Sequence, residues 1–458
     1  MNLILLTIDC LRADHLGCLG YTKQTTPNLD NIARTGILFT QAISVGPSTR
    51  PSFLAICTST YPQMYGGWLY ITASRTTIAQ VLKEHGYCTA AFHTNPWISS
   101  FFGYNKGFDT FDDGIPKLGS RRRLSMLKGL VKHMIARNAR LDYFVYHIFM
   151  VGMATRIIDK PKLLNQKAIA WLYDNPSNFF LWIHYMDAHE PYTPSSGFMS
   201  PLKAHRILRL NTKARKTPAS LSAREVDELV AEYDARISHV DDAIGSLLAT
   251  LRESGILSNT FIIITADHGQ QFMEHGRHGH GNYLYDELIH VPLMIAGPGL
   301  EGKVISQQVS LLDLAPTILD LAGIEKPRAF VGNSLLPLIS GDMASAGDSD
   351  AISETHTHPP HWKFQLAAIR PRIDTTHRRI SLRKGKWKYI YTEGEQDELY
   401  DLDDDPKETQ NVIDLQPEIA MAMRNKITAH IAFEEESAYG ERDLIKASIR
   451  RLKKSGKL

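Results

Sequence analysis

The chain alternates short apolar runs with segments of helical periodicity. Residues 2–9 (NLILLTID) form a nearly continuous apolar run, the pattern of a strand that is buried on both faces. Similar runs predict strands over residues 87–94, 179–184 and 261–267, and apolar residues at helical spacing predict helices over 28–35, 77–85 and 225–251. Strands that alternate with helices favour an α/β fold, in which helices cover both faces of a mostly parallel sheet.

Two later parts of the chain depart from this alternation. Residues 117–165 read as a basic helical insertion, with Leu124, Leu127 and Val131 at helical spacing. After a shift toward Gly, Asp, Ser, His and Pro near 340–380, residues 379–392 predict a hairpin and 416–433 a helix. We therefore expect a main domain, a small C-terminal α+β unit and a basic tail, with the following bounds: 1–365, 366–435 and 436–458.

Polar side chains gather where the predicted strands end. Ligands of doubly wound sheets bind at the carboxyl ends of the strands, so these residues predict a site. They are Asp9, Thr94, Asn95, His184, Asp187, His189, Asp267 and His268, followed by His275, His278 and His280 in a glycine-rich loop. Carboxylate and imidazole groups are ligands for divalent cations such as Zn or Mn.

Taken singly, these residues also have structural explanations. An aspartate after a strand is most often a turn or cap residue. His184 also fits the pattern of a satisfied core histidine, because histidines are intermediate in burial. The conjunction of so many such residues at strand ends favours a functional site.

Several blocks of the sequence resemble the sulfatase family of the alkaline-phosphatase-like superfamily. They are LLTIDCLRADHLGCLGY, GPSTRPSFLAICTSTYP, HYMDAHEPYTP, ITADHGQQFMEHGRHGHG and the terminal KWKYIYTEGEQDELYDLDDDPKETQNV. The resemblance runs nearly end to end. It implies the alkaline-phosphatase-like fold, with residues 1–365 as the catalytic domain, and an ester hydrolase activity.

One departure from the family pattern concerns the nucleophile. The sulfatase signature C-x-P-S-R carries a cysteine or serine that becomes formylglycine, and Thr49 stands at that position. Threonine cannot form the aldehyde, but its alkoxide can act directly as a nucleophile when a metal lowers the pKa of the hydroxyl. The signature arginine is replaced by Phe53, so Arg50 is the nearest cation for substrate binding.

A second departure concerns the metal. Sulfatases that use formylglycine carry Asp-Asn in the later metal strand and bind calcium, whereas this chain has Asp267-His268. An imidazole ligand favours Zn or Mn, with Ca or Mg as the alternatives. The resemblance thus implies one divalent metal ion, held by Asp9, Thr49, Asp267 and His268.

The remaining site residues follow from the same alignment. His189 matches the histidine of the family block P-H-x-P-[YF] and is expected to protonate the leaving alcohol. His280 stands where a substrate-contacting lysine is usual, and we expect it to stabilise charge on the ester oxygens, with His278 nearby as a further contact. Thr94 and Asn95 replace a second lysine, so they would bind the substrate as hydrogen-bond partners.

These residues favour a metal-dependent hydrolase of phosphate or sulfate esters, with phosphomonoesters or phosphodiesters preferred over sulfates. Without formylglycine the chain lacks the group that ejects sulfate, whereas water can hydrolyse a phosphothreonine. A sulfuric ester hydrolase proper remains the alternative, as does a transferase that passes a phospho-group to a lipid or sugar. A non-catalytic binding protein on the same scaffold ranks lower.

The charge distribution adds one clue about partners. The net charge of +2 hides eight basic and no acidic residues in 117–140, and seven basic against two acidic residues in 441–458, so the remainder carries −11. Basic runs are usually solvated helix faces. The alternative is peripheral contact with an anionic membrane surface, whereas nucleic acid is not expected because interleaved aromatic residues and a binding motif are missing.

The compartment is predicted from cysteines and hydropathy. Four cysteines do not make a disulfide framework in 458 residues, and Asp9 interrupts the first apolar run too early for a signal peptide. No apolar stretch reaches the roughly 20 residues of a membrane-spanning helix. The expectation is a cytoplasmic protein, soluble or peripherally bound to a membrane, of unassigned oligomeric state.

Overall fold

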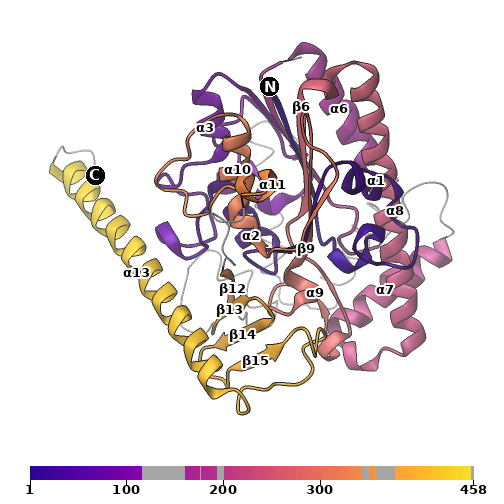
Figure 1. Ribbon diagram of the computed structural model, residues 1–458, viewed down its shortest axis with the longest axis vertical. Helices are drawn as coiled ribbons and strands as arrows, with labels where there is room; N and C mark the ends of the chain where they lie inside the picture. The colour runs from indigo at the N-terminus through magenta and orange to yellow at the C-terminus, as the bar shows by residue number, and fades with distance from the viewer. Residues whose placement is uncertain (116–159, 176, 193–200, 343–349, 357–376, 455–458) are drawn as a thin grey trace, which may run out of the picture.

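A central sheet of nine strands and a smaller sheet of four strands organise the protein (Figure 1). The computed structural model describes residues 1–115, 160–175, 177–192, 201–342, 350–356 and 377–454. In the central sheet most neighbouring strands run parallel, and helices cover both of its faces. The predicted α/β fold with a small C-terminal unit is therefore confirmed.

Strand β1 lies in the middle of the central sheet, between β5 and β6 and parallel to both. The order of the sheet is β10-β2-β9-β6-β1-β5-β3-β4, and β11 also pairs with β2. Its strands are β1 (Asn2–Ile8), β2 (Ile37–Ile43), β3 (Cys88–His93), β4 (Thr110–Asp112), β5 (Phe179–Tyr185), β6 (Thr260–Ala266), β9 (His290–Ala296), β10 (Lys303–Ile305) and β11 (Val309–Ser310). Every residue of β1, β5 and β6 is buried, as the apolar runs require of strands covered on both faces.

Two groups of helices sandwich this sheet (Figure 1). One face carries α1 (Pro27–Thr35), α6 (Lys160–Asp174) and α8 (Ala223–Glu253), and the other carries α2 (Thr49–Thr58), α3 (Ile78–Glu84), α10 (Leu314–Leu321) and α11 (Leu336–Ser340). Helix α7 (Pro201–Lys216) packs beside α8, and the short α9 (Asp286–Ile289) precedes β9. The predicted helices at 28–35, 77–85 and 225–251 correspond to α1, α3 and α8 within two residues at each end.

The C-terminal unit is an antiparallel sheet covered by one long helix. Its elements are β12 (Ala351–His356), β13 (Arg378–Lys384), β14 (Trp387–Thr392), β15 (Glu398–Asp401) and α13 (Pro417–Lys454). The predicted hairpin is β13–β14. Helix α13 continues beyond the predicted end at 433, through most of the predicted basic tail. A two-stranded sheet, β7 (Gln271–Phe272) and β8 (His278–Gly279), completes the fold.

Two predicted features fall mainly outside the described residues. They are the basic insertion at 117–165, of which only 160–165 is described as the start of α6, and the domain boundary between 365 and 366. Within the described part of the chain, the helices are all too short or too polar to cross a membrane.

A buried lysine joins the C-terminal sheet to the main domain. The side chain of Lys388 on β14 is fully buried, and its Nζ lies 2.8 Å from Asp286 Oδ1 and 2.7 Å from Glu408 Oε1. Asp286 begins α9, which leads into the central sheet through β9. Because a buried charge is tolerated only with a partner, this group fixes the two units against one another.

We therefore expect Lys388→Met to destabilise the protein by about 3–5 kcal/mol, because it leaves the buried carboxylate of Glu408 without its cation and Asp286 with Arg383 alone. Urea unfolding at neutral pH measures the effect. Lys384→Met is the matched control, because the Lys384 side chain is 48% exposed and lies 3.8 Å from its partner Asp350. Similar losses of stability in the two variants would contradict this role.

Candidate active site

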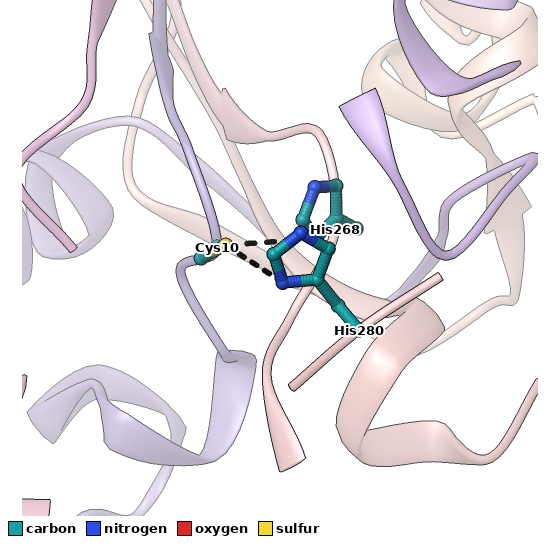
Figure 2. Close-up of side chains that lie close together, drawn as sticks. All are labelled: Cys10, His268 and His280. Atoms are coloured by element: carbon teal, nitrogen blue, oxygen red, sulfur yellow. Dashed lines mark hydrogen bonds between the residues drawn. The ribbon is translucent and has the colours of Figure 1, made fainter. Parts of the chain in front are cut away.

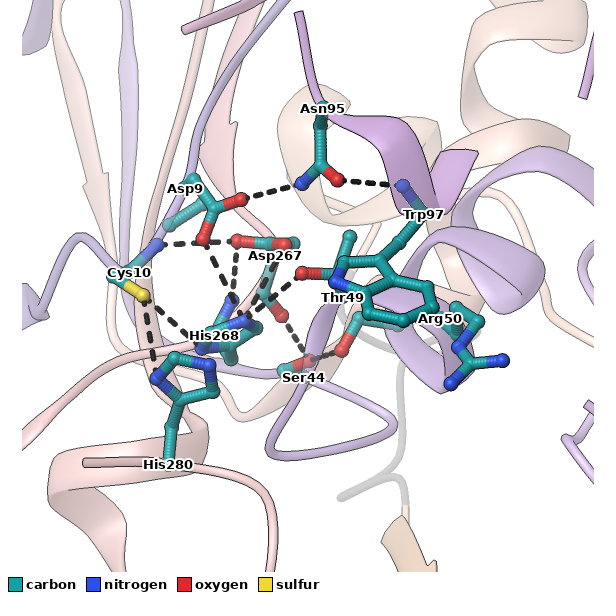
Figure 3. Close-up of polar contacts among 12 residues, drawn as sticks. Asp9, Cys10, Ser44, Thr49, Arg50, Asn95, Trp97, Asp267, His268 and His280 are labelled. Carbon is teal, nitrogen blue, oxygen red and sulfur yellow. Dashed lines mark hydrogen bonds and ion pairs between the residues drawn. The ribbon is translucent and has the colours of Figure 1, made fainter. Parts of the chain in front are cut away.

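The central strands deliver two carboxylates to one point. In the register of the parallel strands, Ile8 of β1 pairs with Ala266 of β6, so Asp9 and Asp267 each follow the last residue of neighbouring strands. Both carboxylates are completely buried. Figure 3 shows them facing one another beside His268 and Thr49. The predicted meeting of strand ends at this edge of the sheet is thus realised.

Each carboxylate uses only one of its oxygens in hydrogen bonds. Asp9 Oδ2 accepts from Asn95 Nδ2 at 2.8 Å, and Asp267 Oδ1 accepts from the backbone N–H of His268 at 3.0 Å. Asp9 Oδ1 and Asp267 Oδ2 are buried and have no hydrogen-bond partner among the described residues. Buried acceptors without donors are rare in proteins, so these two oxygens indicate a binding site for a ligand.

The pKa values of Asp9 and Asp267 also indicate that this site binds a positively charged ligand. Burial raises the pKa of Asp9, but nearby histidines, His189 foremost, outweigh it and hold that pKa below its usual range. Burial and then the negative charge of Asp9 raise the pKa of Asp267 well above its usual range. Two buried carboxylates cannot both ionise without a counter-charge, so the pair must share either a proton or a cation.

His268 offers its Nε2 atom to the same point. Its Nδ1 lies 2.9 Å from the carbonyl oxygen of Gly269, which can only accept, so Nδ1 carries the proton and Nε2 has a free lone pair. Nε2 lies 3.5 Å from Asp267 Oδ2, 3.7 Å from Asp9 Oδ1 and 3.5 Å from Thr49 Oγ1. Burial lowers the pKa of His268 to about 4, which keeps the ring neutral near neutral pH.

These groups fit a single divalent cation. Ligand atoms of Asp9, Asp267 and His268 all lie within 4.8 Å of one another, and each residue is buried. Two orphaned carboxylate oxygens and an imidazole lone pair form a mixed O/N donor set, which suits Zn or Mn better than an all-oxygen site would.

Thr49 reaches this point because of how α2 begins. Thr49 is the first residue of α2 and is almost fully buried. Gly46 allows the turn before it, since a Cβ there would lie 2.7 Å from Pro51. The hydroxyls of Ser44 and Ser52 lie 2.9 Å apart, and that of Ser44 also donates to the backbone oxygen of Asp267. The start of the helix is therefore tied directly to the strand end that carries Asp267.

Asn95 and His184 hold Asp9 in place. His184 Nε2 lies 3.3 Å from Asp9 Oδ2, and its Nδ1 lies 3.0 Å from Thr7 Oγ1. Both side chains are completely buried. His184 is therefore a buried core histidine, as its structural explanation predicts. It also has a role at the site, because it contacts Asp9. Asn95 binds Asp9, and Thr94 beside it is half-buried and packs against Gly114.

Three of the predicted histidines approach the site to different degrees. The ring of His280 lies 4.5 Å from that of His268 and 5.1 Å from that of His189, centre to centre. His189 also lies close to Asp9. His278 lies deeper, with Nε2 3.3 Å from Glu190 Oε2, which is itself paired with Arg215. His189 and His280 thus share the pocket with the carboxylates, while His278 braces the loop behind them.

Other candidates point elsewhere. The guanidinium of Arg50 lies over the rings of Trp97 and Phe102, away from the carboxylates (Figure 3). His275 stacks on Tyr285 at 3.7 Å and Asp187 pairs with Arg236 on α8, so both serve packing between elements.

Two further residues shape the site without having been among its predicted members. Cys10 has a left-handed backbone (φ 61°), which directs its N–H to Asp267 Oδ1 at 3.3 Å and its thiol toward His268 and His280 (Figure 2). Gln270 Oε1 lies 2.7 Å from His280 Nδ1 and orients that ring. The place of Cys10 directly after Asp9 in the first block is the signal that could have found it, whereas no sequence feature marked Gln270.

Comparison with known proteins places this arrangement in a family. The family model described as Sulfatase matches residues 1–324, and the model described as N-sulphoglucosamine sulphohydrolase, C-terminal, matches residues 274–432. Arylsulfatase K of Rattus norvegicus is 25% identical over 448 residues, which cover 90% of this chain and 74% of the relative.

Solved structures share the same fold. The phosphonate monoester hydrolase of Agrobacterium radiobacter superposes with a TM-score of 0.69 at 21% identity, covering 94% of this chain and 96% of that one. A putative sulfatase from Bacteroides thetaiotaomicron gives a TM-score of 0.70 at 21% identity, covering 96% and 94%.

Metal analysis of a variant tests the cation site. We expect Asp267→Asn to weaken metal binding by at least about 100-fold, because losing a ligand exceeds the loss caused by outer-shell changes. Elemental analysis after expression in Zn- and Mn-supplemented medium measures the bound metal. Asp187→Asn is the control, since Asp187 is a buried carboxylate that faces α8 instead. Equal metal content in Asp267→Asn and the unmodified protein would exclude this site.

The stability of the protein in acid tests the burial of His93, which lies close to the site. Burial, then the charge of His184, lowers the pKa of His93 from 6.5 to about 3. As pH falls from 6.5 toward 3, the unfolded chain binds this proton first, so the fold loses stability, by about 2 kcal/mol at pH 5. His93→Phe removes that loss. Unfolding free energies at pH 7.5 and pH 5 should therefore differ by about 2 kcal/mol less in the variant, and an unchanged difference would refute the assignment.

Proposed function

Because this chain belongs to the sulfatase family and is an ester hydrolase, we propose that it cleaves phosphate or sulfate esters through Thr49 as a covalent nucleophile. The observation that carries the proposal is the position of Thr49 Oγ1, 3.5 Å from His268 Nε2 and beside the two orphaned carboxylate oxygens. A hydroxyl beside a bound cation is readily activated as a nucleophile, because a nearby positive charge stabilises its alkoxide.

The metal would be held by Asp9, Asp267 and His268, with Thr49 at its open side. A cation bound there lowers the pKa of the Thr49 hydroxyl and offsets negative charge on the ester oxygens. The hydroxyl proton leaves to solvent before attack. The N-terminal end of α2, which Thr49 begins, adds a favourable field for the anionic ester.

Thr49 Oγ1 then attacks the phosphorus or sulfur atom in line with the leaving oxygen. The new bond to Oγ1 forms as the bond to the leaving alcohol breaks, and the alcohol oxygen takes the electron pair together with a proton from His189. His189 is suited to this step because its Nδ1 faces the carbonyl oxygen of Glu190, which leaves Nε2 to exchange the proton. His280 lies next to both His189 and His268, where it can contact the ester oxygens.

Water completes the cycle. It attacks the phosphorus or sulfur atom of the Thr49 ester and gives one proton to His189. The bond to Oγ1 breaks, Oγ1 takes the electron pair, and a proton from solvent restores the Thr49 hydroxyl. Asn95 supports both steps indirectly, because its amide fixes the orientation of Asp9. The role of Asn95 is therefore to position a metal ligand, in addition to any hydrogen bond to the substrate.

Phosphate is the favoured reacting group. Hydrolysis of a phosphothreonine proceeds by attack at phosphorus, whereas formylglycine sulfatases release sulfate through a hemiacetal that threonine cannot form. Sulfate esters are the second candidate, favoured by the similarity to arylsulfatase K and to steryl-sulfatase of Rattus norvegicus, which is 27% identical over 421 residues. Turnover of an aryl sulfate, a phosphomonoester and a phosphodiester by one metal-replete preparation separates the two.

Substitution of the nucleophile tests the mechanism. We expect Thr49→Ala to lower kcat by at least about a thousandfold on the best of those esters, because it removes the attacking oxygen. Thr49→Ser is the matched control, since it keeps the hydroxyl and should retain measurable turnover. Metal content is verified in every preparation. Thr49→Ala at the turnover of the unmodified enzyme would rule out covalent catalysis by Thr49.

A further inference from the structure

An exposed group of aromatic rings borders the proposed nucleophile. Tyr70, Trp97 and Phe101 are 42%, 50% and 71% exposed, although large apolar side chains are usually covered. Their rings are continuous: Tyr70 lies 6.3 Å from Phe101, and Phe102 lies 5.0 Å from Phe101 and 6.1 Å from Trp97, centre to centre. An exposed apolar patch of this kind marks a binding surface.

The patch is attached to the active site by hydrogen bonds. Asn95, which binds Asp9 through Nδ2, accepts the backbone N–H of Trp97 through Oδ1 at 2.9 Å. Trp97 lies on the short helix η4 (Pro96–Ile98), which contacts α2, the helix that begins with Thr49 and Arg50. The Asn95 side chain therefore contacts both Asp9 and the backbone of Trp97.

Arg50 adds a positive charge to the same surface. Its guanidinium lies 4.6 Å from the ring of Trp97, 5.1 Å from that of Trp68 and 5.6 Å from that of Phe102. In the described part of the chain, no carboxylate forms an ion pair with Arg50. Removal from water lowers the pKa of Arg50, a sign that its charge is only partly compensated by the rings. An anionic group on a ligand would supply the missing partner.

We propose that Arg50, Trp97, Phe101 and Tyr70 form a subsite for the organic group of the ester, and that this group combines a flat ring with a negative charge of its own. The proposal rests on the proposed function only for the location of the reacting group beside Thr49. Flat rings stack on the exposed indole and phenyl faces, while Arg50 binds the second anion. The substrate class is thus a ring-containing ester that carries a further carboxylate, sulfate or phosphate.

Equilibrium binding tests this subsite without turnover. The probes are 4-hydroxybenzoate, which has both ring and carboxylate, phenol, which has only the ring, and acetate, which has only the charge. Calorimetry on the metal-replete enzyme should show 4-hydroxybenzoate as the tightest ligand. Trp97→Ala and Phe101→Ala should each weaken it about fivefold. Arg50→Gln should weaken 4-hydroxybenzoate about tenfold and leave phenol unchanged.

The control variant is Tyr173→Ala on α6. Tyr173 is 67% exposed, close to the exposure of Phe101, and belongs to the face of the sheet opposite α2. It should bind 4-hydroxybenzoate as the unmodified enzyme does. Because Phe101 is mostly exposed, Phe101→Ala remains informative even if Arg50→Gln fails to fold.

Two outcomes would overturn the subsite. One is equal affinity for the three probes in all variants. The other is that the ring variants lose binding to anionic liposomes while their affinity for 4-hydroxybenzoate is unchanged, which would make the patch a membrane contact. A Thr49→Ala enzyme that keeps full turnover would refute the proposed mechanism, but the binding pattern of the probes would still decide the subsite.

Discussion

Two carboxylates that must share one counter-charge dominate this structure. Asp9 and Asp267 are completely buried at neighbouring strand ends, and each keeps one oxygen without a hydrogen-bond partner among the described residues. The fold surrounds them with groups that favour a cation over a proton: neutral His268 with its free Nε2, and Asn95 donating to Asp9. Burial and then the negative charge of Asp9 raise the pKa of Asp267, and a divalent cation would offset this cost by pairing with both charges.

The rest of the site is arranged around this pair by short links of hydrogen bonds. The Ser44 hydroxyl contacts the backbone of Asp267 and so fixes the start of α2, where Thr49 stands. Asn95 forms hydrogen bonds with both Asp9 and the backbone of Trp97, and Gln270 orients His280. Because these links end near strand termini and helix starts, they fix the position of Thr49 relative to the two carboxylates. A preorganised site of this kind spends little free energy on reorganisation during the reaction.

The C-terminal unit also contributes to this rigidity. Ser353 on β12 donates to the backbone oxygen of Ser44, and Lys388 on β14 pairs with Asp286 at the start of α9. His275, expected near the substrate, instead contacts the backbone oxygen of Glu408 and stacks on Tyr285. The glycine-rich loop therefore divides its histidines between two tasks: His280 faces the cation site, and His275 fastens the C-terminal unit to the main domain.

The sequence by itself determined the alternation of strands and helices, the meeting of Asp9 with Asp267-His268, and the presence of threonine where the sulfatase signature has cysteine or serine. Apolar runs and strand ends are local features, and parallel strands bring such ends together whatever lies between them. Only the tertiary structure decided which histidines face the candidate cation site, that Cys10 has a left-handed backbone, and that Arg50 lies on aromatic rings instead of at the carboxylates. Those outcomes depend on side chains far apart in the chain, whose orientation follows from packing and hydrogen-bond partners that no local pattern specifies.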